Sequence, residues 1–464
     1  MTIILFDLIY NKMKSLKDFL LNVFRLLLAN NFSFLINFIF VIIFLRVFSP
    51  ETYGIYVLIY STATLFQLFI NGPLHPANFN LFAKFSEQKK LGKVKSLLFF
   101  SAILEIALAF TTYGLAFLAA PWLTHIFKGF NIVFFRVYLL TIIFMSLDQT
   151  SRSLYHWQNQ FTVIALLDIL RSAFKLAGLL CVVFFFSKSL MNVINSIVLT
   201  FLLIFLINLW VFYRALKVNK LLAQRSLPLA KQDQALYRNI FLNGYISSSL
   251  RAFSDNIVVI LLGILNDPLG IAIYRLAYNI SYPYMFISNS ISIVQYPSLT
   301  KLWIKGQGEQ LGRIIRRSSL FISLLCIPLA ILCYYLYSFL LRFVIKNPAL
   351  LASIPTVAIL LVGFSIYLIF YWGYSLVYST NKHYLANINT AIQLIVLAGF
   401  GLLLIPYYGF NGAAWATTMA LIVSAVVYFF QTNKSIPILR LRSLENLILL
   451  LKKKLALFTS FTKE

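Results

Sequence analysis

Two similar stretches of sequence lie 218 residues apart: residues 49–60 read SPETYGIYVLIY, and residues 267–278 read DPLGIAIYRLAY. Four positions are identical at this constant offset: Pro50 with Pro268, Ile55 with Ile273, Tyr56 with Tyr274, and Tyr60 with Tyr278. Each stretch joins the first long apolar run of one half of the chain to the second. This equivalent placement indicates an internal repeat. The repeat is imperfect, because Gly54 corresponds to Ala272.

The composition excludes a soluble globular protein. Of the 464 residues, 61% are hydrophobic and only 11% are charged. Soluble domains average about 45–50% apolar residues and about 25% charged residues. A bilayer crossing needs about 20 apolar residues. Such runs fall at about 22–45, 53–80, 97–119, 131–150, 162–186, 191–212, 241–265, 269–297, 316–340, 353–378, 384–405 and 411–430. Because these runs are apolar on all sides rather than alternating, they predict helices and not a barrel. The sequence therefore predicts an all-α polytopic membrane protein with about twelve transmembrane helices.

The longest polar stretch, 213–240, divides the chain near its middle. Because the repeat equates spans one and two with spans seven and eight, both halves should insert in the same direction. We therefore expect two six-helix lobes related by a pseudo-two-fold axis along the membrane normal. The predicted segments are an N-terminal cytoplasmic or interfacial segment (1–18), an N-lobe (19–212), a cytoplasmic inter-lobe loop (213–240), a C-lobe (241–434) and a basic amphipathic cytoplasmic tail (435–464).

The distribution of basic residues predicts the orientation. With twelve spans drawn, 28 of the 39 Lys and Arg residues fall on one side of the membrane and five on the other; the remaining six lie within spans. Because cytoplasmic loops are enriched in Lys and Arg, both termini are expected to be cytoplasmic. The net charge of +26 is thus attributed to orientation and to contact with anionic membrane lipid, not to nucleic acid.

Motifs of soluble enzymes are absent from the sequence. There is no phosphate-binding loop of the form GxxxxGK followed by Ser or Thr. The four histidines, His75, His125, His156 and His383, are scattered without an HExxH pattern or cysteine partners, so no metal site is expected. We therefore predict a protein that is not an enzyme and that needs no cofactor or metal.

Ten ionisable residues lie inside the apolar runs, where each charge costs about 2.5–3.5 kcal/mol to insert. The cations are Arg25, Arg136, Arg171, Lys175, Arg251 and Arg275, and the acids are Glu105, Asp148, Asp168 and Asp255. Spacings of three or four residues suggest local ion pairs of Asp148 with Arg152, Asp168 with Arg171, and Arg251 with Asp255. Structural pairing or snorkelling toward a span end is the alternative to a functional role.

Polar residues also gather on single helix faces. At about 100° per residue, Arg25, Asn30 and Asn37 share a face of span one, and Ser247, Arg251 and Asp255 share a face of span seven. Hydrogen bonding between helices would explain such stripes. The excess of cations favours instead a shared aqueous cavity that accepts an anion. The candidates for cavity lining or ion coupling are Asp255, Asp168, Arg171, Lys175, Asn30, Asn37, Ser247, Asn71 and Asn279.

Four stretches resemble the polysaccharide transporter branch of the multidrug/oligosaccharidyl-lipid/polysaccharide exporter superfamily, the Wzx-type flippases. They are VFSPETYGIYVLIYS (47–61), NDPLGIAIYRLAY (266–278), QYPSLTKLW (295–303) and LIPYYGFNGAAWATTMALIVSAVVYF (404–429). The resemblance covers about residues 20–434. It implies a central cavity lined by spans one, two, seven and eight, in the inner (cytoplasmic) membrane of a bacterium.

The same resemblance implies that the substrate is an undecaprenyl-pyrophosphate carrying an O-antigen or related polysaccharide repeat unit, moved from the cytoplasmic to the outer leaflet. The residues that would face the pyrophosphate are Arg251, Arg25 and Arg275. A polysaccharide polymerase and the chain-length machinery would be partners in lipopolysaccharide assembly.

Two other function classes stay open at this point. A multidrug or cation antiporter of the same superfamily should have an acid-rich cavity, whereas cations exceed acids here. A membrane glycosyl-transfer or polymerase enzyme needs a sizeable external loop, and no predicted external loop exceeds about 15 residues.

The predicted topology can be tested with reporter fusions. Fusions at Lys93 and Lys305 should report a cytoplasmic location, and fusions at Lys128 and Lys346 an external one, because the bias of Lys and Arg fixes the orientation. A reversed result at any of these four sites would contradict the twelve-span arrangement.

Overall fold

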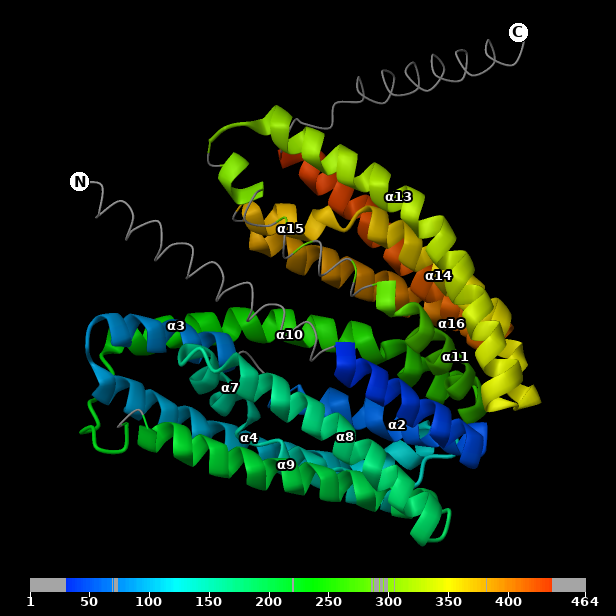
Figure 1. The fold of residues 1–464 in the computed structure, drawn as a ribbon, viewed down its shortest axis with the longest axis horizontal. Coiled ribbons are helices and arrows are strands. Elements are labelled where there is room, and N and C mark those ends of the chain that lie inside the picture. Colours follow the sequence, from blue (N-terminus) through cyan, green and yellow to red (C-terminus); the bar gives the residue numbers. More distant parts are fainter. Residues whose placement is uncertain are drawn as a thin grey trace, which may run out of the picture. The chain divides into compact units, whose positions relative to one another are not determined.

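The described part of the computed structural model consists of helices joined by turns and short loops, without a β-strand (Figure 1). The structure describes residues 31–435 apart from 69, 71–73, 219, 220, 285, 286, 288–291, 293, 294, 296–298, 304 and 381. The predicted segment 1–18 and nearly all of the predicted tail therefore lie outside the described residues.

The chain forms two compact units, the first comprising residues up to Leu276 with Ser338–Ile354 and Leu402–Ala413. Its first helix is Asn31–Val47. The helices that follow are α2 (Pro50–Gln67), α3 (Leu74–Glu87), α4 (Leu91–Ile126), α5 (Ile132–Tyr138), α6 (Leu140–Phe144), α7 (Asp148–Trp157), α8 (Phe161–Phe185), α9 (Leu190–Val218), α10 (Lys231–Leu265) and the first part of α11 (Pro268–Ser281). Within this unit α8 packs along α9, α3 packs on α7, and α10 packs on α2 and α3.

The second unit comprises Ala277–Tyr337, Pro355–Gly401 and the residues from Ala414 onward. Its helices are the end of α11 and most of α13 (Gly308–Phe339), α14 (Ser353–Ile369), α15 (Trp372–Ser379) and α16 (His383–Ser435). A π-helical turn, Leu340–Ile345, and a 3-10 turn, Pro348–Ala352, belong to the first unit. The predicted boundary between lobes stays a prediction.

Seven helical stretches in the described residues are long and apolar enough to cross a bilayer. They are Leu91–Ile126, Ile132–Trp157, Leu190–Val218, Lys231–Leu265, Gly308–Ile345, Pro348–Val377 and Tyr384–Thr432. The last has 49 residues, or about 74 Å of helix at 1.5 Å per residue, which suffices for two crossings. Together with the shorter helices, these stretches follow the twelve predicted apolar runs.

Two helix breaks lie inside predicted spans or between them. Predicted span four is divided into α5, α6 and α7, and Leu147 before α7 has a left-handed φ of 75°, which is uncommon for a residue with a side chain. The long helix α16 is interrupted at Gly409, where φ is 54° and ψ is −130°. Because glycine lacks a Cβ, it adopts this conformation without steric cost. This break separates the two apolar runs that were predicted as spans eleven and twelve.

The N-terminal end of α10 is held by a cluster that we call the Asp233 clamp: Asp233 with Lys84 and Lys93. Lys84 at the end of α3 donates to one carboxylate oxygen of Asp233 at 2.9 Å, and Lys93 at the start of α4 donates to the other at 2.8 Å. Lys95 donates to the backbone oxygens of Leu222 and Gln224. Part of the predicted loop 213–240 is thus helical and fixed, since α9 ends at residue 218 and α10 begins at residue 231.

The two repeated stretches meet at a close approach between backbones. A Cβ on Gly54 of α2 would lie 1.8 Å from the carbonyl oxygen of Pro268, the first residue of α11. Ser49 caps α2 by accepting a hydrogen bond from the Thr52 amide at 3.3 Å. A side chain at residue 54 would therefore have to displace the backbone of Pro268.

Replacing Gly54 by alanine should destabilise the protein by about 1–3 kcal/mol or more, because the added methyl group overlaps backbone. We expect a lower melting temperature for the purified variant and less protein in membranes. Gly114→Ala is the matched control, since a Cβ there meets nothing within 4 Å. A Gly54→Ala variant as stable as the parent would show that the two stretches do not pack this closely.

Candidate functional site

Lys175 is the polar centre of a group formed by α8, α2 and the helix Asn31–Val47. Its ammonium nitrogen lies 4.3 Å from the ring centroid of Phe40 and 5.8 Å from that of Tyr56. Asn37 is 3.5 Å away through its side-chain oxygen and donates through its nitrogen to Ser172 at 2.9 Å. Aromatic faces attract a desolvated cation, so the two rings stabilise the charge of Lys175. None of the contacts just described is with an acid.

Arg275 links this lysine to two further charges of the first unit. Arg275 of α11 repels Lys175 electrostatically, and Arg275 and Arg251 both attract Asp255 of α10. The side chains of Arg251 and Asp255 are exposed, and those of Lys175 and Arg275 are partly buried. We call Lys175, Arg251, Arg275 and Asp255 the cation group. It holds three positive charges and one negative charge.

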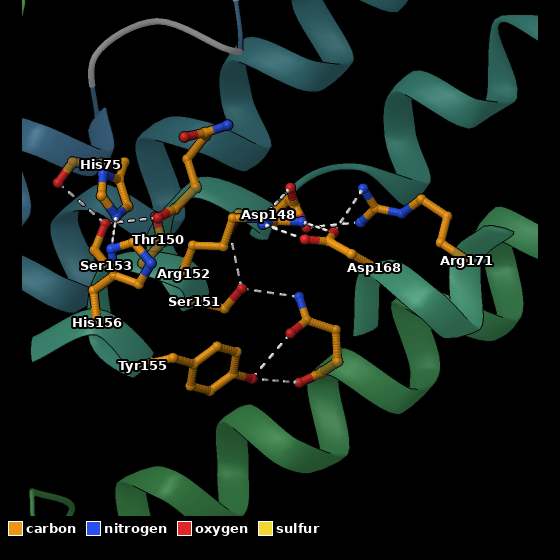
Figure 2. A network of polar contacts seen from close by, with 12 residues as sticks. His75, Asp148, Thr150, Ser151, Arg152, Ser153, Tyr155, His156, Asp168 and Arg171 are labelled. Carbon is orange, nitrogen blue, oxygen red and sulfur yellow. Dashed lines mark hydrogen bonds and ion pairs between the residues drawn. The ribbon is translucent and has the colours of Figure 1, made fainter. Parts of the chain in front are cut away.

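A second group of charges joins α7 to α8 (Figure 2). Asp148 accepts from Arg152 at 2.9 Å and from Arg171 at 2.9 Å, on different carboxylate oxygens. Asp168 accepts two hydrogen bonds from Arg152 in a bidentate pair, and Arg171 lies 4.0 Å from it. The four residues form a closed ring of alternating charge, the charge ring, which is neutral overall. The fork geometry of arginine permits both guanidinium groups to bridge two carboxylates.

Glu105 of α4 caps the start of α7. Its fully buried carboxylate accepts from the amides of Gln149 at 2.9 Å and Thr150 at 3.0 Å, and from the Thr150 hydroxyl at 2.6 Å. The first amides of a helix have no partner within the helix, and the positive end of the helix dipole favours an anion there. The buried charge is therefore compensated without a cation.

Two more polar contacts extend this network along α7. His75 of α3 and His156 are joined by a ring nitrogen to ring nitrogen hydrogen bond of 2.9 Å. Tyr155 donates to the side-chain oxygen of Asn208 at 2.9 Å, and Asn208 donates to Ser151 at 3.0 Å. Among the described residues no group of three or more His, Cys, Asp or Glu side chains could hold a metal ion.

The predicted site residues fall into several places. Lys175 and Asn37 are in contact, and Arg251, Arg275 and Asp255 share one electrostatic group. Asp168 and Arg171 belong to the charge ring. Ser247 lies one turn before Arg251 on α10, and Asn279 lies in the second unit. Arg25, Asn30 and Asn71 lie outside the described residues.

Sequence reasoning missed several partners in these networks. The local pairs of Asp148 with Arg152 and of Asp168 with Arg171 are present, but the two contacts that close the charge ring are between helices. The sequence identifies Glu105 only as a charge inside an apolar run, and it gives no indication that His75 and His156 are in contact. The sequence indicates these contacts only in that it places ionisable groups inside apolar runs, where leaving them unpaired is costly.

The sequence profile of the family described as "Polysaccharide biosynthesis protein" matches residues 19–303, which is more than half of the chain. The chain belongs to this family. The resemblance found in the sequence motifs is therefore confirmed at the level of the family. An uncharacterized membrane protein of Methanocaldococcus jannaschii is 24% identical to this family member over 383 residues, covering 76% of this chain and 71% of that protein.

Solved structures share the fold at low sequence identity. A multidrug resistance MATE family transporter of the MOP superfamily in an inward-facing conformation has a TM-score of 0.73 at 11% identity, covering 87% of this chain and 94% of that one. The lipid II flippase MurJ in an inward closed conformation has a TM-score of 0.69 at 14% identity, covering 88% and 87%. A MOP superfamily transporter from Pyrococcus furiosus has a TM-score of 0.59 at 13% identity, covering 90% and 95%. This family member thus has the all-α, twelve-helix, two-lobe fold of these transporters.

The charge ring can be tested with a double-mutant cycle. Arg152→Met leaves Asp148 and Asp168 sharing one arginine, and Asp168→Asn leaves two arginines with one acid, so each should cost about 3–5 kcal/mol. The double variant retains the neutral pair of Asp148 with Arg171, and it should lose much less than the sum. Melting of the purified proteins measures this coupling, with exposed Arg214→Met on α9 as the control. Additive losses would contradict a closed ring.

Proposed function

We propose that this protein is a flippase, and not an enzyme, that moves a lipid-linked oligosaccharide from the cytoplasmic to the outer leaflet by alternating access. Membership in a polysaccharide biosynthesis family supports the oligosaccharide part of the substrate. The fold shared with MOP-superfamily transporters, one of which is named as a lipid II flippase, supports transport as the activity.

The single observation that carries the proposal is the cation group. Lys175, Arg251 and Arg275 together exceed their acidic neighbour Asp255, so the group has a net charge of about +2. A phosphate-linked lipid brings the compensating negative charge, and arginine binds phosphate oxygens through two parallel hydrogen bonds. The side chain of Arg251 is exposed. We propose undecaprenyl pyrophosphate as the carrier, with O-antigen or a related repeat unit as the cargo.

The remaining parts of the proposal concern place and partners. We propose the bacterial inner membrane, with both termini cytoplasmic, and action beside a polysaccharide polymerase and chain-length machinery. We keep Arg25 as a contact near the cytoplasmic entrance and Arg275 as one near the exit. Asp255 and Asp168 are proposed as candidates for coupling to a proton or sodium gradient, and anionic lipid contacts the basic cytoplasmic surface.

A multidrug or cation antiporter is the second candidate, favoured by the TM-score of 0.73 with a MATE family transporter. Its cationic cargo would require acids to outnumber bases at the binding residues, and the cation group has the opposite balance. A membrane glycosyl-transfer or polymerase enzyme is a third and weaker candidate. Uptake of a cationic dye and flipping of a lipid-linked oligosaccharide in the same proteoliposomes would separate the two transport activities.

Arg251→Ala should abolish complementation of a flippase-deficient strain while the amount of protein in the membrane stays normal, because the anion loses a charged contact. Arg251→Lys should restore part of the activity, since the charge survives but the fork of donors does not. The measurement is surface polysaccharide against membrane protein level in the same cells.

Arg46→Ala is the matched control, because Arg46 is an exposed arginine at the end of the helix Asn31–Val47. It should complement like the parent. Full activity of Arg251→Ala, or a loss explained entirely by missing protein, would assign Arg251 a structural role and remove it from the anion path.

A further inference from the structure

Arg136 is a half-buried cation that the proposed transport path does not use. It lies on α5, one turn after Asn131, which caps the helix by accepting from the amides of Val133 and Phe134 at 2.9 and 3.2 Å. The predicted topology puts this end of α5 at the external side of the membrane. A guanidinium one turn below the interface is within snorkelling reach of lipid headgroups.

The contacts of Arg136 are aromatic and not ionic. Its guanidinium carbon lies 4.1 Å from the ring centroid of Phe117 on α4, and Tyr113 packs on Phe117 with centroids 5.9 Å apart. Its Nε is buried and has no hydrogen-bond partner in the described part of the chain. No ion pair within 4.0 Å involves Arg136 among the described residues. Phe117 thus covers one face of the Arg136 guanidinium, and no carboxylate of the described residues pairs with its nitrogen atoms.

No acid among the described residues forms an ion pair with Arg136. Glu105 caps α7, Asp148 and Asp168 form the charge ring, and Asp233 forms the clamp. The four acids outside the described residues lie in segments predicted to be cytoplasmic: Asp7, Asp18, Glu445 and Glu464. A protein carboxylate is therefore not the counter-charge that the described residues supply to Arg136.

The two helices that carry Arg136 and Phe117 also present exposed apolar side chains. Val133 on α5 is 54% exposed, and on α4 Leu118 is 77% and Trp122 is 70% exposed. In a membrane-spanning unit such a surface faces acyl chains, and tryptophan is enriched at the headgroup level. Hydrophobic contacts for a lipid tail and a lone cation near the headgroups thus occur on the same two helices.

We propose that Arg136 and Phe117 form a binding site for the phosphate of an anionic phospholipid in the external leaflet. The phosphodiester of a phosphatidylglycerol-type lipid brings one negative charge. Its oxygens accept hydrogen bonds from the guanidinium, while Phe117 holds the guanidinium plane from the other side. The acyl chains lie along the apolar surface of α4 and α5. This lipid is a structural ligand, distinct from the transported cargo.

The test measures lipid preference next to the site rather than over the whole protein, whose basic cytoplasmic surface also attracts anionic lipid. The six native tryptophans are replaced by phenylalanine, and Tyr113→Trp places one reporter beside Phe117. Quenching by brominated phosphatidylglycerol against brominated phosphatidylcholine then gives a local relative affinity. We expect a preference for phosphatidylglycerol of about tenfold, the size of one charge-assisted contact.

Arg136→Gln should remove this preference. Arg136→Lys should retain part of it, because the ammonium keeps the positive charge but cannot donate two parallel hydrogen bonds to the phosphate. Lys128→Gln is the control, since Lys128 is an exposed cation in the same external turn, and it should leave the preference unchanged. Equal quenching by the two lipids in the parent, or an unchanged preference in Arg136→Gln, would overturn the proposal.

A second measurement uses the chain with its native tryptophans. The melting temperature of the parent should be higher in phosphatidylglycerol nanodiscs than in phosphatidylcholine nanodiscs, and Arg136→Gln should lose part of that difference while Lys128→Gln keeps it. An Arg136→Gln variant with the same lipid-dependent difference as the parent would assign Arg136 to packing on Phe117 alone. No oligosaccharide is present in either measurement, so failure here leaves the proposed transport function untouched.

Discussion

A charge in a bilayer needs a compensating charge or dipole near it, and the first unit is organised around this requirement. The charge ring satisfies it with two acids and two arginines divided between α7 and α8, so that neither helix carries its charges alone. Removing one member would leave an uncompensated charge in a low-dielectric interior, whereas the complete ring is neutral. The orientation of α7 against α8 follows, because only a narrow range of rotations lets both arginines reach both carboxylates.

The break in predicted span four depends on the same requirement. The left-handed Leu147 directly precedes α7, and the first amides of α7 would be costly to leave unpaired in the membrane. Glu105 supplies the missing acceptors from α4, and the helix end in turn compensates the carboxylate. The break therefore places Asp148 at the first position of α7, where its side chain accepts from two arginines. A continuous helix would have no free amides for Glu105.

The sequence predicts features that lie within one helix better than contacts between helices. Apolar runs and the bias of basic residues predict spans because they depend on length and composition alone. The pair of Asp148 with Arg152 was predictable because helical spacing fixes it. The contacts of Arg152 with Asp168 and of Glu105 with Thr150 were not, because they depend on how neighbouring helices are rotated about their axes. Sequence periodicity gives the polar face of a helix but not the helix that this face meets.

The Asp233 clamp has a consequence for the order in which the protein can assemble. Its lysine partners, on α3 and α4, precede Asp233 in the chain and are synthesised earlier. When α10 leaves the ribosome, the end of α3 that carries Lys84 and the start of α4 that carries Lys93 have already been synthesised. The seventh span can therefore dock on the helices before it without waiting for the second unit.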